Sequence, residues 1–73
     1  MVTVYTIPSC AQCDSTKRYL TKHMIEYTEI DMSKDEVAYS RVKEMGYTQA
    51  PVVEYGDEHW SGFRFEKLAK IAA

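Results

Sequence analysis

Residues 2–13 read Val-Thr-Val-Tyr-Thr-Ile-Pro-Ser-Cys-Ala-Gln-Cys, and this stretch decides the expected fold. Its first five residues, Val2–Thr6, are β-branched or aromatic, which is typical of a β-strand. Ser9 and Gln12 follow with the Ser-x-x-Gln spacing of a helix capping box. The stretch therefore predicts a strand that leads into a helix, with Ser9 as the N-cap and Cys10 in the first helical position.

The next part of the chain continues this alternation. The first helix is expected to bury an apolar stripe made of Cys13, Leu20 and Met24. A second strand is predicted over residues 26–30, and Ser33 with Glu36 then repeats the capping-box spacing at the start of a second helix. Gly46 suits the end of that helix, because glycine tolerates a left-handed backbone. The buried face of the second helix is expected to contain Val37, Ala38, Val42 and Met45.

The last third of the chain predicts a hairpin and a final helix. Two strand-like runs, 52–55 and 58–60, flank Gly56-Asp57, which is a hairpin signal. A helix over 63–71 follows, with an expected buried set of Phe65, Leu68 and Ala72. The order β-α-β-α-β-β-α predicts a thioredoxin-like α/β fold, in which a four-stranded mixed sheet has helices on both faces. We expect one domain over residues 1–73.

Composition and charge exclude several classes of protein. The 73 residues are 45% hydrophobic and 27% charged, as in an ordinary globular chain. The net charge of −2 gives no electrostatic footprint for nucleic acid, and Arg64, Lys67 and Lys70 are interpreted as a solvated helix end. No run approaches the roughly 20 apolar residues of a membrane span, and the N-terminus lacks an export signal. We therefore expect a cytoplasmic protein.

Cys10 and Cys13 are the candidate catalytic residues. Three residues apart, they close too small a loop to stabilise the fold, and in a reducing cytosol such a pair indicates redox or metal chemistry. The thiolate is the nucleophile in disulfide exchange, and a helix N-terminus lowers a thiol pKa from about 8.5 to between about 3.5 and 7.5. We expect Cys10 to attack and the more enclosed Cys13 to resolve the mixed disulfide.

The cysteine pair has two other interpretations, a structural zinc site and inert core cysteines. A structural zinc site needs four ligands, but only His23 and His59 remain as candidates and they lack the usual spacing. Inert core cysteines are disfavoured by the position of Cys10 at an open helix end. No metal is therefore expected.

The two prolines flank the predicted site. Pro8 lies just before the first helix and stiffens the turn into it. Pro51 follows Ala50 at the start of the third strand, where a cis peptide bond would leave neighbouring backbone groups free to pair with an extended substrate. The residue types alone do not decide whether this bond is cis or trans.

Three motifs resemble the NrdH-redoxins. They are Val-Tyr-Thr-x-Pro-x-Cys-x-Gln-Cys at residues 4–13, Gly-Tyr-x-Gln-Ala-Pro-Val-Val at 46–53 and His-Trp-Ser-Gly-Phe-Arg at 59–64. The resemblance implies a glutaredoxin-like fold with thioredoxin-like activity. Members of that family pass electrons from NADPH, through thioredoxin reductase, to the disulfide of a class Ib ribonucleotide reductase, so these two enzymes are the expected partners of a monomeric chain.

The resemblance also assigns roles to residues. It implies a redox-active disulfide between Cys10 and Cys13 with no bound cofactor, and a cis Pro51 preceded by Ala50. Supporting roles fall to Pro8, Ser9 and Gln12. The segment expected beside the active site, where a partner would bind, consists of Trp60, Ser61, Gly62, Phe63 and Arg64. For Trp60, core packing and partner docking are both open, because aromatic residues serve both roles.

The sequence departs from the family pattern at two positions. Ile7 stands where many relatives carry lysine, so activation of Cys10 depends more on the helix end, and Phe65 replaces a proline. The glutathione-binding signature of glutaredoxins, a Gly-Gly with an acidic helix start, is missing. A glutathione-dependent glutaredoxin and a redox-sensing module without turnover remain as alternatives. The redox potential is not derivable from the Ala-Gln dipeptide between the cysteines.

Overall fold

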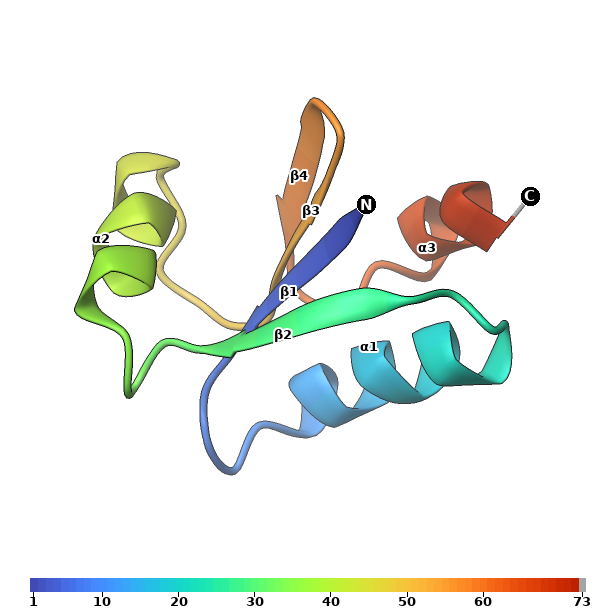
Figure 1. Cartoon of the computed structure of the whole chain (residues 1–73), viewed down its shortest axis with the longest axis horizontal. Coiled ribbons are helices and arrows are strands. Elements are labelled where there is room, and N and C mark those ends of the chain that lie inside the picture. The colour runs from blue at the N-terminus through green and yellow to red at the C-terminus, as the bar shows by residue number, and fades with distance from the viewer. Residues whose placement is uncertain (73) are drawn as a thin grey trace.

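The computed structural model describes residues 1–72 and confirms the predicted order of elements. These are β1 (Val2–Thr6), α1 (Ala11–Lys22), β2 (Tyr27–Asp31), α2 (Glu36–Glu44), β3 (Val52–Tyr55), β4 (Glu58–Ser61) and α3 (Phe65–Ala72). The strands form one sheet in the order β2-β1-β3-β4 (Figure 1). β1 pairs parallel with β2 and antiparallel with β3, which makes the sheet mixed as expected. The fold is thioredoxin-like.

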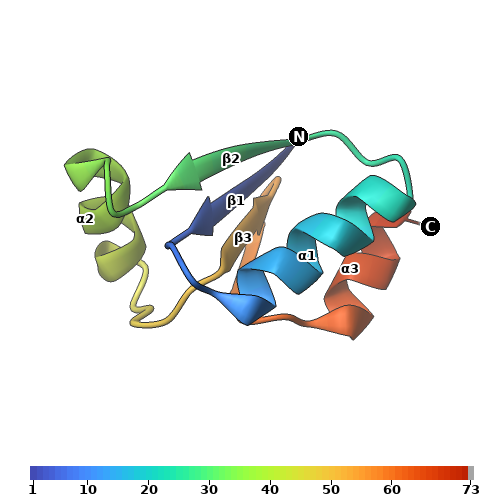
Figure 2. The same cartoon turned by 90° about the horizontal axis from the view of Figure 1, so that it is seen from below.

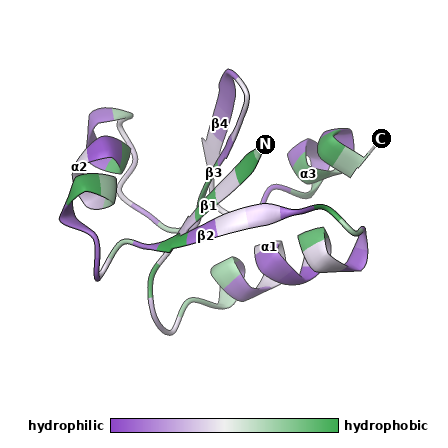
Figure 3. Ribbon diagram, in the orientation of Figure 1, coloured by the Kyte–Doolittle hydropathy of each residue, from purple (hydrophilic) through white to green (hydrophobic). Residues whose placement is uncertain are grey.

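Helices cover both faces of the sheet. α1 and α3 lie side by side on one face and α2 lies on the other (Figure 2). Adjacent residues of β1 pack against helices on opposite faces of the sheet, because side chains alternate along a strand. Val4 packs with Leu20 and Leu68 on the α1–α3 side, whereas Tyr5 packs with the α2 side. Hydrophobic and hydrophilic residues accordingly alternate along each helix, as the green and purple bands of Figure 3 show.

The hairpin and the second strand lie close to their predicted positions. Val52–Tyr55 is confirmed as β3, and β4 extends one residue beyond the prediction, to Ser61. β2 begins at Tyr27 rather than at residue 26, because its parallel ladder with β1 runs from Val2–Tyr27 to Thr6–Asp31. Among residues 1–72, no helix is long and apolar enough to cross a membrane.

The start of α2 differs from the prediction. Asp35 is its N-cap and accepts a hydrogen bond from the Ala38 amide at 3.0 Å. Ser33 instead donates its hydroxyl and its amide to the carboxylate of Asp31, which lowers the pKa of Asp31. With this cap, Ala38 and Val42 face the sheet at helical spacing, and Val37, one position earlier, is 80% exposed. The predicted burial of Val37 was therefore wrong.

The start of α3 also differs. The helix begins at Phe65 rather than at residue 63, and the amides of Lys67 and Leu68 donate to the carbonyl of Arg64. Leu68 is buried as predicted. Phe65 is 60% exposed and Ala72 is also exposed, which contradicts their predicted burial. Leu68 is the buried residue of this short helix, and Ile71, one turn later, packs against the same core cluster.

α1 ends in a Schellman motif. The amide of Ile25 donates to the carbonyl of Leu20 and the amide of Met24 to the carbonyl of Thr21. Gly46 ends α2 in the predicted left-handed conformation, with φ +94°, but the equivalent position after α1 is Met24, with φ +56°. Met24 is 92% exposed and lies beyond the helix, so its assignment to the apolar stripe was wrong.

We expect Met24→Gly to stabilise the protein by about 0.5–1 kcal/mol, because glycine adopts the left-handed backbone without the steric cost that methionine bears. Urea unfolding measures the difference. Lys22→Gly is the matched control, since it places glycine inside the last turn of α1 and should destabilise by about the same amount. A loss of stability in Met24→Gly would contradict this account of the helix end.

Candidate functional site

Cys10 caps the helix that carries it. Its backbone is extended (φ −118°, ψ 105°), its carbonyl accepts from the Asp14 amide at 3.1 Å, and its Sγ accepts from the Cys13 amide at 3.1 Å. Ser9 is not the N-cap, and Cys10 is not in the first helical position. Ser9 has φ +57° and lies in the turn that aims the next residue at the helix. The sulfur therefore takes the place of a capping oxygen.

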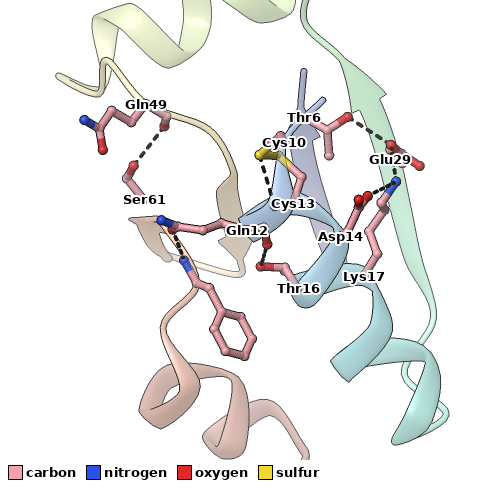
Figure 4. Close-up of a disulfide and its surroundings, with 11 residues drawn as sticks. Thr6, Cys10, Gln12, Cys13, Asp14, Thr16, Lys17, Glu29, Gln49 and Ser61 are labelled. Carbon is pink, nitrogen blue, oxygen red and sulfur yellow. Dashed lines mark hydrogen bonds and ion pairs between the residues drawn. A yellow bond between two sulfur atoms is a disulfide. The ribbon is translucent and has the colours of Figure 1, made fainter. Parts of the chain in front are cut away.

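Cys10 and Cys13 form a disulfide, and their Cα atoms are 5.2 Å apart. Cys10 is partly exposed, whereas Cys13 is 1% exposed beneath it (Figure 4). An external disulfide can therefore reach one sulfur of the pair, while the other can react only with its neighbour. This asymmetry matches the order of attack expected from the sequence.

The charges next to the pair neutralise one another. The carboxylate of Glu29 accepts from Lys17 Nζ at 3.0 Å and from the hydroxyl of Thr6 at 2.9 Å. The bond from Lys17 lowers the pKa of Glu29, and the same contact raises the pKa of Lys17. Asp14 lies 3.8 Å from the same ammonium. Lys17 is thus paired with carboxylates and Ile7 carries no charge, which leaves the N-terminus of α1 as the group at Cys10 whose dipole favours a thiolate in general.

The Ala50–Pro51 bond is cis, as the resemblance implied. The carbonyl of Pro51 accepts from the Gly62 amide at 2.8 Å, and the hydroxyl of Ser61 donates to the carbonyl of Gln49 at 2.9 Å. These bonds tie the loop before β3 to the loop after β4. The carbonyl of Pro51 is therefore occupied and is not among the free backbone groups that we expected there.

Gln12 joins the cysteine segment to the same loop. Its Oε1 accepts from the Phe63 amide at 3.0 Å, rather than completing a capping box with Ser9 (Figure 4). Gly62 has φ +89°, and a Cβ added there would lie 3.3 Å from this oxygen. The residue between the two cysteines thus holds the C-terminal loop against the start of α1.

The structure brings part of the 60–64 segment to the surface. Trp60 is 3% exposed and packs in the core, with Lys67 Nζ 5.7 Å from its ring, so its side chain is not a docking residue. Phe63 is 37% exposed and Arg64 is exposed, with its guanidinium 2.7 Å from Glu66. Pro8 is also exposed, in the turn before Cys10.

The two histidines lie away from the cysteines. His23 is the C-cap of α1 and stacks on Tyr19, while His59 Nδ1 is 2.7 Å from the hydroxyl of Tyr47. Within residues 1–72, no three His, Cys, Asp or Glu side chains gather as metal ligands would.

A cavity beside Ala50 was not anticipated from the sequence. Its volume is about 260 Å³, and it lies on the α2 side of the cis-proline loop. The apolar part of its lining consists of Ile7, Met32, Tyr39, Val42, Tyr47 and Ala50. These residues come from separate segments, so no local pattern in the chain could have revealed it.

We expect Gly62→Ala to destabilise the protein more than Gly46→Ala does. Both positions require a left-handed backbone, at a cost of about 1–2 kcal/mol for alanine, but only at Gly62 does the new methyl group press on a neighbour within 4 Å. Weakening of the Gln12–Phe63 bond should add about 0.5–1.5 kcal/mol in urea unfolding. The contact would have no effect if both glycine substitutions lowered the free energy of unfolding equally. The same would follow if the difference between them stayed unchanged when Gln12 is replaced by alanine.

Comparison with known proteins places the chain in a family. The glutaredoxin family model matches residues 2–60. The glutaredoxin-like protein NrdH of Lactococcus lactis subsp. cremoris is 42% identical over 72 residues, which cover 99% of this chain and 100% of the relative. The NrdH protein of Escherichia coli strain K12 is 33% identical over 70 residues, covering 96% and 86%.

A solved structure agrees with the sequence comparison. The NrdH-redoxin from Escherichia coli, a glutaredoxin-like protein with a thioredoxin-like activity profile, superposes with a TM-score of 0.93 at 33% identity, covering 96% of this chain and 92% of that one. The fold, the full-length sequence similarity and the Cys10–Cys13 disulfide therefore all indicate the same family. The chain belongs to the glutaredoxin family of thiol-disulfide oxidoreductases and, within it, to the NrdH glutaredoxin-like proteins.

Proposed function

We propose that this protein is a dithiol electron donor to class Ib ribonucleotide reductase and that thioredoxin reductase, using NADPH, returns it to the reduced form. The observation that carries the proposal is the full-length similarity to NrdH proteins, including one with a thioredoxin-like activity profile. The large subunit of the ribonucleotide reductase would supply the substrate disulfide. Such a donor works in a reducing compartment, the cytoplasm.

The reaction uses the two sulfurs in sequence. The Cys10 thiolate attacks one sulfur of the substrate disulfide, and the other substrate sulfur leaves as a thiolate. Cys13 then loses its proton and attacks Cys10 Sγ, which breaks the mixed disulfide and releases the second substrate thiolate. Two electrons have then passed to the substrate, and the Cys10–Cys13 disulfide has formed. Thioredoxin reductase then passes two electrons from NADPH to the Cys10–Cys13 disulfide, which breaks the sulfur–sulfur bond and restores both thiols.

Several groups beside the start of α3 that could hold glutathione already have partners within the protein. The Phe63 amide donates to Gln12, and the Gly62 amide donates to Pro51. Glu66 pairs with Arg64, and the pKa of Glu66 is lowered first by its own backbone amide and then by that guanidinium. A carboxylate arriving in this segment would have to displace these partners, which supports a protein reductant over glutathione.

The cavity next to Ala50 also supports a protein as the reaction partner. It is apolar, it adjoins the cis-proline loop, and it is large enough for one or two side chains of a docked polypeptide. Glutathione offers no apolar group that would fill it.

We expect NADPH with thioredoxin reductase to support reduction of insulin disulfides by this protein much faster than glutathione with glutathione reductase does. The test is to follow NADPH oxidation in both systems at equal protein concentration. Rapid turnover with glutathione and slow turnover with thioredoxin reductase would support the glutaredoxin alternative instead. Absence of turnover in both systems would favour the redox-sensing alternative.

Two cysteine variants are the controls. Cys10→Ser should abolish turnover, because it removes the exposed nucleophile. Cys13→Ser should retain the first step only and accumulate a mixed disulfide with the substrate, which non-reducing electrophoresis detects. Turnover by Cys10→Ser would contradict the assigned roles.

A further inference from the structure

Charge is unevenly distributed over the fold, although the net charge is only −2. Residues 11–22 and 64–72, which include α1 and α3, hold six of the nine basic residues and two of the eleven acidic ones. These two helices lie side by side on one face of the sheet (Figure 2). That face therefore carries a formal charge of +4, and the rest of the chain carries −6.

Not all of these cations are free to meet a partner. Lys17 is paired with Glu29, Arg64 with Glu66, and Lys67 lies over the ring of Trp60. Arg18 and Lys22 are exposed, and neither takes part in an ion pair found among residues 1–72.

Arg18 and Lys22 line a shallow groove together with aromatic side chains. The groove, of about 280 Å³, is lined by these two cations together with Ser15, Tyr19 and Phe63. Phe65 packs edge-on against Tyr19 at 5.7 Å between ring centroids and is 60% exposed, which extends the aromatic surface. We call this surface, made of Ser15, Arg18, Tyr19, Lys22, Phe63 and Phe65, the α1 groove.

The α1 groove adjoins the segment that carries the reactive disulfide, because Phe63, which lines the groove, is bonded to that segment. The Phe63 amide is bonded to Gln12, which lies between the two cysteines. Along the helix axis, Arg18 is about 12 Å and Lys22 about 18 Å from Cys10, at 1.5 Å per residue. An extended polypeptide covers these distances in about four to six residues.

We infer that the α1 groove binds an acidic segment of the protein whose disulfide is reduced, with carboxylates about four to six residues from the reacting cysteine. The inference rests on the proposed function, because it takes the substrate to be a protein disulfide. Aromatic side chains of the groove contact apolar groups of the segment, and Arg18 and Lys22 pair with its carboxylates. The groove holds two free cations and the exposed Lys70 is a third on the same face, which is too few for a nucleic acid because it needs several phosphate contacts.

Synthetic peptides test the inference without either proposed partner enzyme. Each peptide is closed by a Cys-x-x-Cys disulfide and carries, four to six residues away on both sides, two glutamates, two glutamines or two lysines. The protein is reduced with dithiothreitol, freed of reductant and mixed with each peptide, and the second-order rate constant is measured. At about 0.01 M salt the acidic peptide should react about threefold to tenfold faster than the neutral one, and near 1 M salt the difference should vanish.

Charge-reversal variants locate the effect. Arg18→Glu and Lys22→Glu should remove or invert the preference for the acidic peptide, measured for each variant as the ratio of its rate constants with the acidic and the neutral peptide. Lys34→Glu alters net charge by the same amount at an exposed turn on the α2 side and should preserve the preference.

Equal rates of the wild-type protein with acidic and basic peptides would overturn the inference. So would an effect of Lys34→Glu as large as that of Lys22→Glu, because net charge rather than the groove would then be responsible. Failure of the reduced protein to act on the neutral peptide would instead count against the proposed disulfide reduction itself, so the two failures are distinguishable.

Discussion

The hydrogen bond from the Cys13 amide to Cys10 Sγ is the constraint on which the site depends. It fixes the N-terminus of α1 at the nucleophile, so that a sulfur occupies the position where helices usually place a serine or aspartate oxygen. Negative charge on that sulfur is stabilised by the amide and by the helix dipole. α1 is in turn held in place by Leu20, which is fully buried against β1 and α3. The chemistry of one atom is thus connected to the packing of the whole α1–α3 layer.

A second set of bonds assembles the surface around that atom. The loops at residues 49–51 and 61–63 and the start of α1 are far apart in the chain, and three hydrogen bonds join them. These are Ser61 Oγ to the Gln49 carbonyl, the Gly62 amide to the Pro51 carbonyl and the Phe63 amide to Gln12 Oε1. They occupy backbone amides and carbonyls that would otherwise be free to bind a small ligand. What remains exposed suits a polypeptide: an apolar cavity next to Ala50 on one side and the basic, aromatic α1 groove on the other.

Much of this could be predicted from the sequence, because local signals and the fold agree. The order of the elements and the sheet could be predicted from the β-branched runs, the Gly56-Asp57 turn and Gly46. The spacing of the cysteines predicted the redox chemistry. Errors arose where two residues competed for one role. Asp35 rather than Ser33 caps α2, and Cys10 rather than Ser9 caps α1, because the cap is selected by the tertiary position of the preceding turn as well as by residue type. The burial of Trp60 and the bond from Phe63 to Gln12 depend on contacts over long sequence separations, which no local pattern contains.

The central claim is that the end of α1 activates Cys10 without help from a neighbouring lysine. The most direct measurement is a titration of the Cys10 thiol in the Cys13→Ser variant, followed by the ultraviolet absorbance of the thiolate as pH is raised. The account predicts a pKa clearly below the value of about 8.5 for a free cysteine, because the residue 13 amide and the helix dipole favour the thiolate. A pKa at or above about 8.5 would contradict it and would mean that the position of Cys10 at the helix end does not activate the sulfur.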